Sequence, residues 1–84
     1  MKNVRMYTTP ICPYCVRAKS LLKKKGAEID EVDVMMDTDA RAEMEAKSGG
    51  ARSVPQIFIG DTYVGGCDEL YALEKDGKLD PLLS

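Results

Sequence analysis

The fold prediction starts from Cys12-Pro13-Tyr14-Cys15, two cysteines separated by a proline and a tyrosine. Upstream, apolar and polar residues alternate over residues 3–8, which predicts a β-strand. Downstream, apolar residues recur at helical spacing over residues 13–25, and Gly26 provides a stop. The motif is therefore expected where a first strand passes into a first helix, with Cys12 at the helix N-terminus and Cys15 one turn inside.

This junction gives the two cysteines different chemistry. A helix begins with unpaired backbone N–H groups and with the positive end of its dipole, and both stabilise a thiolate. Cys12 is therefore the candidate nucleophile. The helix dipole alone stabilises a thiolate by at most about 2 kcal/mol, which is less than a large drop in the thiol pKa requires. We therefore also expect N–H···S hydrogen bonds to Cys12 from the backbone of Tyr14 and Cys15. Cys15 should lie deeper in the protein. The alternative interpretation is a pair of buried, inert thiols.

The rest of the chain alternates strand-like and helix-like segments. Gly60-Asp61 resembles a two-residue turn between antiparallel strands, and Asp68 is the candidate N-cap of a helix that Gly77 ends. The order β-α-β-α-β-β-α predicts an α/β fold with a mixed sheet covered by helices, and 84 residues predict a single domain, residues 1–84. Further strands are expected at 29–34, 56–59 and 62–64, further helices from Asp37 to Gly49-Gly50 and over 68–75, and a packed tail at 79–83.

Composition excludes several classes of function. The chain has three cysteines and no histidine, so a Ser-His-Asp triad, a Cys-His protease site and a histidine-containing zinc site are all excluded. A four-cysteine zinc site lacks one thiol, and we expect no bound metal. The net charge of −2 and the lack of a basic stripe interleaved with aromatic residues do not favour nucleic-acid binding.

The sequence predicts a cytoplasmic protein. No signal peptide is recognisable, and no stretch approaches the ~18 apolar residues of a membrane span. Cytoplasmic thiols stay reduced, so a close cysteine pair there is more often redox-active or metal-binding than a permanent disulfide.

Several motifs, in order, resemble those of dithiol glutaredoxins of the small bacterial type. The resemblance covers nearly the whole chain, and it implies a thioredoxin-like fold with a central four-stranded mixed sheet flanked by helices. It also implies an oxidoreductase of cell redox homeostasis that carries electrons from glutathione to disulfides. The segments that carry the resemblance are Tyr7-Thr8, Cys12-Pro13-Tyr14-Cys15, Arg17-Ala18-Lys19, Ser53-Val54-Pro55-Gln56-Ile57-Phe58-Ile59-Gly60 and Val64-Gly65-Gly66-Cys67-Asp68-Glu69-Leu70.

The resemblance assigns roles to both cysteines of the motif. Cys12 attacks a protein disulfide or a glutathione mixed disulfide, and Cys15 resolves the intermediate with a protein, which leaves a redox-active Cys12–Cys15 disulfide. Glutathione serves as electron donor and co-substrate. The implied partners are disulfide-containing or glutathionylated proteins, with ribonucleotide reductase as an example by family analogy, and the implied state is a monomer.

The resemblance further implies a glutathione-binding site. Its expected elements are a cis peptide bond before Pro55, the N–H and C=O of Val54 paired with the cysteinyl part of glutathione, and the N–H groups of Cys67 and Asp68 on the γ-glutamyl carboxylate. The Asp68 carboxylate would hold the ammonium group, and Cys67 is expected to have no catalytic part. The complete expected set is Tyr14, Ser53, Val54, Pro55, Gly66, Cys67 and Asp68. The plainer interpretations are a proline that starts a strand and a glycine-rich hairpin exit with a helix cap.

One position departs from the family pattern. Many glutaredoxins have a lysine where Thr9 stands, and that lysine meets the glycine carboxylate of glutathione. Lys47 or Arg52 are candidate substitutes, although exposure to solvent is the plainer expectation for both.

Two other functions stay open at this stage. An iron–sulfur carrier, in which two chains and two glutathiones share a cluster through Cys12, is disfavoured by the proline in C-P-Y-C. An inert domain with a permanent Cys12–Cys15 disulfide is the other alternative.

Overall fold

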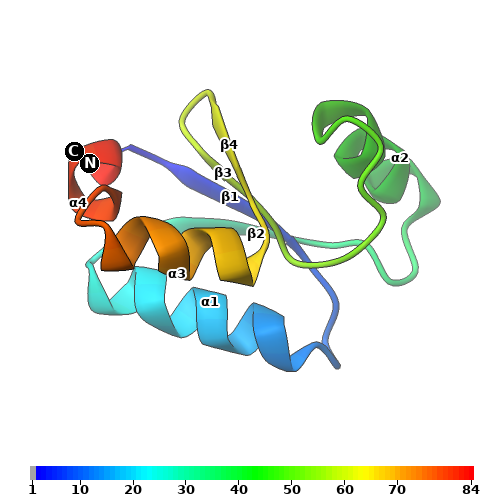
Figure 1. Cartoon of the computed structure of the whole chain (residues 1–84). Helices are drawn as coiled ribbons and strands as arrows, with labels where there is room; N and C mark the ends of the chain where they lie inside the picture. The colour runs from blue at the N-terminus through cyan, green and yellow to red at the C-terminus, as the bar shows by residue number, and fades with distance from the viewer. Residues whose placement is uncertain (1) are drawn as a thin grey trace.

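The computed structural model describes residues 2–84, and its elements follow the predicted order (Figure 1). The boundaries lie within one or two residues of the expected ones, and the tail forms a short helix. The strands are β1 (Val4–Thr8), β2 (Ile29–Asp33), β3 (Gln56–Ile59) and β4 (Thr62–Gly65); the helices are α1 (Pro13–Lys24), α2 (Thr38–Lys47), α3 (Cys67–Lys75) and α4 (Leu79–Leu83).

The strands form one mixed, four-stranded sheet in the order β2-β1-β3-β4. β1 pairs with β2 in parallel and with β3 antiparallel, and the Gly60-Asp61 turn joins β3 to β4 as an antiparallel hairpin. The predicted mixed sheet and hairpin are therefore confirmed. Since β1 and β2 run in parallel, the loops that follow them leave the sheet at the same edge. Cys12 lies at the end of the short loop that follows β1.

Helices cover both faces of the sheet. Figure 1 shows α1 and α3 side by side against one face, while α2 lies on the other side. The larger core lies under α1 and α3 and includes Met6, Leu22, Ile57 and Leu70, which are 0% exposed. Tyr7, Val34 and Met44 form a smaller core under α2. The two helices that begin near Cys12, α1 and α3, thus pack on the larger core, and this packing fixes the positions of their N-termini.

The start of α3 differs from the prediction. The helix begins at Cys67 with Gly66 as N-cap, so Asp68 is not the cap. The carboxylate of Glu69 accepts the backbone N–H of Gly66 at 2.7 Å instead. This is one half of a capping box, because glycine has no side chain to return the second bond. By contrast, Asp37, where this helix was expected to open, is the N-cap of α2, and its carboxylate accepts the N–H of Ala40 at 3.0 Å.

Of the helices in residues 2–84, none combines the length and the apolar character needed to cross a membrane.

Candidate active site

Cys12 is the N-cap of α1, and its sulfur makes two contacts. The Sγ atom accepts the backbone N–H of Cys15 at 3.3 Å. The thiol also donates toward the carbonyl oxygen of Val54, with Sγ and O 3.6 Å apart. Within residues 2–84 the sulfur receives no bond from the N–H of Tyr14, so that expectation was wrong. An N-cap side chain reaches the second or third helical N–H, and here it takes the third.

Cys15 lies in a different environment, although it is only one turn away. Cys15 is buried, with 2% of the residue exposed. Burial, together with the hydrogen bond and the negative charge of Cys12, raises the pKa of Cys15 to about 12. Cys12 is partly exposed. The expected difference in depth between the two thiols is therefore confirmed.

The loop before β3 approaches Cys12 from the other side. The Val54–Pro55 peptide bond is cis, as expected. Ser53 is exposed and Pro55 is buried at the start of the strand. This loop places the backbone of Val54 against the sulfur of Cys12, 42 positions away in the sequence.

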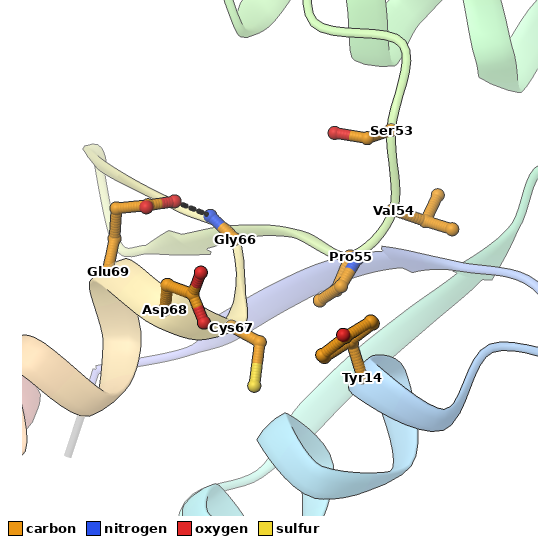
Figure 2. A pocket seen from close by; sticks show the side chains of 8 residues that line it. All are labelled: Tyr14, Ser53, Val54, Pro55, Gly66, Cys67, Asp68 and Glu69. Carbon is orange, nitrogen blue, oxygen red and sulfur yellow. Dashed lines mark hydrogen bonds between the residues drawn. The ribbon is translucent and has the colours of Figure 1, made fainter.

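A cavity of about 200 Å³ lies beside these groups. Figure 2 shows its lining, which comes from the start of α1, the loop before β3 and the start of α3. Every residue expected at the glutathione site lies here, together with Glu69, which the sequence analysis missed. Glu69 lies three residues after Gly66, the spacing of a capping box, but the expected cap was Asp68, so this spacing was not recognised in the sequence. The lining residues are Tyr14, Ser53, Val54, Pro55, Gly66, Cys67, Asp68 and Glu69.

The start of α3 offers the cavity unpaired donors. The first intrahelical bond runs from the N–H of Leu70 to the carbonyl of Gly66. Among residues 2–84, no acceptor is found for the backbone N–H groups of Cys67, Asp68 and Glu69. Free N–H groups and the helix dipole at this position suit a carboxylate or another anion.

Cys67 is buried, with 6% of the residue exposed. Burial raises its pKa, with a smaller opposing effect from the charge of Arg17. Its neutral form is therefore favoured, in contrast to a thiol that must ionise to act as a nucleophile.

The candidate substitutes for the missing lysine are not in the cavity lining. The Lys47 ammonium lies 3.7 Å from the carboxylate of Glu43, and the guanidinium of Arg52 lies 3.5 Å from the carboxylate of Glu45. Both cations are at least half exposed, at 50% and 84%. Thr9 is also absent from the lining.

No group of three or more cysteine or carboxylate side chains is arranged to hold a metal ion within the part of the chain that the structure describes.

Known proteins resemble this chain in both sequence and structure. The family model for Glutaredoxin matches residues 4–64. A glutaredoxin of Pseudomonas aeruginosa is 54% identical over 84 residues, which cover 100% of this chain and 99% of the relative. The solution structure of a glutaredoxin from Brucella melitensis has a TM-score of 0.85 at 58% identity, over 99% of this chain and 89% of that chain. A crystal structure of a buckwheat glutaredoxin-glutathione complex has a TM-score of 0.86 at 32% identity, over 98% of this chain and 76% of that chain.

Proposed function

Because this chain belongs to the glutaredoxin family, with its thioredoxin-like fold and thiol–disulfide oxidoreductase role, we propose that it depends on glutathione. In this proposal it reduces protein disulfides and glutathione mixed disulfides. The observation that carries the proposal is the cavity beside Cys12, which is lined by a loop backbone and by an open helix N-terminus.

The first step belongs to Cys12. Its thiolate attacks one sulfur of the target disulfide, a new S–S bond forms to Cys12, and the other sulfur leaves as a thiolate that takes up a proton. The N–H of Cys15, 3.3 Å from the Cys12 sulfur, and the start of α1 favour the negative charge on that sulfur. Ionisation also removes the hydrogen that the thiol directs at the Val54 carbonyl, so this carbonyl becomes free to accept a hydrogen bond from a ligand.

The second step divides according to substrate. With a protein disulfide, Cys15 loses its proton and attacks the sulfur of Cys12, which releases the protein as a dithiol and leaves a Cys12–Cys15 disulfide. Attack becomes easier at this stage because the charge of Cys12, one cause of the raised pKa of Cys15, disappears when Cys12 enters the mixed disulfide. With a glutathionylated protein, Cys12 carries glutathione, and a second glutathione releases it as glutathione disulfide.

Glutathione also restores the oxidised enzyme. Two molecules supply two electrons: the first opens the Cys12–Cys15 disulfide and forms a mixed disulfide with Cys12, and the second leaves with the first as glutathione disulfide. Residues Tyr14, Ser53, Val54, Pro55, Gly66, Cys67 and Asp68 form the proposed binding site.

The two ends of that site match the two ends of the γ-glutamyl-cysteinyl unit. The Val54 N–H and C=O pair with the cysteinyl backbone like an added strand. The unpaired N–H groups of Cys67 and Asp68 receive the γ-glutamyl carboxylate, and the Asp68 carboxylate receives the ammonium. We further propose a monomer that acts on disulfide-containing or glutathionylated proteins in the cytoplasm, where glutathione is kept reduced.

The proposal is tested by comparing glutathione with cysteinylglycine, which has the same thiol and lacks the γ-glutamyl group. We expect glutathione to reduce the Cys12–Cys15 disulfide at least roughly tenfold faster, because only glutathione can use the start of α3. The measurement is stopped-flow reduction of the oxidised protein at matched thiolate concentrations. Equal rates would contradict the proposed site.

A further inference from the structure

Gln56 is a buried polar side chain that the proposed chemistry does not use. It is the first residue of β3, directly after Pro55, and it is 3% exposed. A buried amide is unfavourable unless its donors and acceptors have partners. The bonds of this amide therefore show what it holds in place.

Its bonds join β4 to the loop that faces Cys12. The Nε2 atom of Gln56 donates to the carbonyl oxygen of Ser53 at 2.9 Å and lies 3.3 Å from the Ser53 hydroxyl. Its Oε1 atom accepts from the hydroxyl of Tyr63. The Tyr63 ring in turn packs against Phe58, with ring centroids 4.9 Å apart. The loop carbonyl is thus attached to the sheet through one side chain.

The carbonyl of Ser53 and the N–H of Val54 belong to the same peptide unit. This unit is planar, and in its trans form the C=O and N–H point in opposite directions. Fixing the direction of the Ser53 carbonyl therefore fixes the direction of the Val54 N–H. The next carbonyl, that of Val54, faces the Cys12 sulfur at 3.6 Å.

We propose that Gln56 is a positioning residue for the reaction: its amide orients the Ser53–Val54 peptide so that the Val54 N–H is ready for the cysteinyl backbone of glutathione. The inference rests on the proposed glutathione dependence. Gln56 itself does not line the cavity, so it acts through Val54. Tyr63 has the supporting role of holding the amide in the orientation that directs its NH2 group at Ser53.

The test uses three substitutions that divide the network. Gln56→Met keeps the length and removes both donor and acceptor. Gln56→Glu keeps an acceptor for Tyr63 and, when ionised, loses the donor to Ser53. Tyr63→Phe removes only the distal bond. Tyr71→Phe is the matched control, because it removes a tyrosine hydroxyl bonded to a backbone carbonyl, that of Arg17 at 3.3 Å, outside this network.

Steady-state kinetics with a glutathionylated peptide supply the first measurement. We expect Gln56→Met and Gln56→Glu to raise KM roughly tenfold, which corresponds to one lost bond to a buried partner, with kcat changed less than about twofold. Tyr63→Phe should raise KM about two- to threefold, and Tyr71→Phe should change neither constant. An unchanged KM in both Gln56 variants, or a loss confined to kcat, would overturn the positioning role.

Nuclear magnetic resonance of the free proteins supplies a measurement that needs no activity. The amide signal of Val54 should shift or broaden in both Gln56 variants and stay in place in Tyr71→Phe. A Val54 signal unmoved by both Gln56 substitutions overturns the inference even if the kinetics change. A wild-type protein inactive on the glutathionylated peptide refutes the proposed function instead, and the Val54 signal still decides the role of Gln56.

Discussion

Two helix N-termini face the same cavity, and they are built differently. At α1 the cap is Cys12, whose own sulfur accepts the N–H of Cys15. At α3 the cap is Gly66, which has no side chain. The carboxylate of Glu69, in the first turn of the helix, accepts the backbone N–H of Gly66. The N–H groups of Cys67 and Asp68 therefore stay open to the cavity. The positive end of the α1 dipole thus stabilises charge on the protein's own Cys12 sulfur, whereas the positive end of the α3 dipole is available to the charge of a ligand.

The largest expected effect is on activity, and it concerns Cys12 at the start of α1. Cys12→Ser should reduce both protein-disulfide reduction and deglutathionylation to the uncatalysed background, because serine supplies no thiolate. Serine is also a good N-cap, so the variant should unfold at the same denaturant concentration as the wild type. Enzyme assays and denaturant unfolding check this pair of results, and residual turnover above background would contradict the role of Cys12.

The next effect concerns the glycine that leads into the open helix start. Gly65 has φ +113°, and a Cβ there would lie 2.8 Å from the Glu69 carboxylate oxygen that caps α3. Gly65→Ala should therefore lower the free energy of unfolding by about 2–3 kcal/mol, through backbone strain and displacement of the cap.

Gly77→Ala is the matched control for Gly65→Ala. Gly77 also has a positive φ, +70°, but a Cβ there meets nothing within 4 Å. Only the backbone strain remains, and we expect a loss of about 1 kcal/mol. Equal losses in the two variants, measured by denaturant unfolding, would show that the Glu69 cap contributes nothing.

A smaller effect concerns the ligand side of α3. Asp68→Asn removes the charge proposed to hold the ammonium of glutathione, and we expect KM for glutathione to rise about three- to tenfold with little change in kcat. Asp61→Asn, in the turn between β3 and β4, is the control with the same chemical change outside the cavity. If both variants keep the wild-type KM, Asp68 has no part in binding.

The sequence was sufficient for the features that depend on local pattern. Strand alternation, helical spacing and glycine stops placed the elements within one or two residues, and Pro13 and Cys12 located the start of α1. The resemblance to glutaredoxins predicted that residues from three separate segments of the chain would lie together at the cavity. Periodicity alone could not have done so, because these segments meet only in the folded chain.

The features that were missed depend on side-chain orientation and tertiary contacts. The cap of α3 depends on how Glu69 folds back toward Gly66, which Gly65 permits by having no side chain. The contact between the Cys12 sulfur and the Val54 carbonyl depends on a distant loop. The bonds of Gln56 likewise depend on the pairing of β3 with β4. None of these contacts leaves a periodic signal in the sequence.

The most direct test of the proposed division of labour is Cys15→Ser, assayed on both substrate classes. The account predicts that reduction of a protein disulfide falls at least roughly a hundredfold, because the mixed disulfide with Cys12 is no longer resolved within the protein. Deglutathionylation of a peptide should stay within about threefold of the wild-type rate, since a second glutathione completes that reaction. An equal loss on both substrates would contradict the assignment of Cys12 as attacking thiol and Cys15 as resolving thiol.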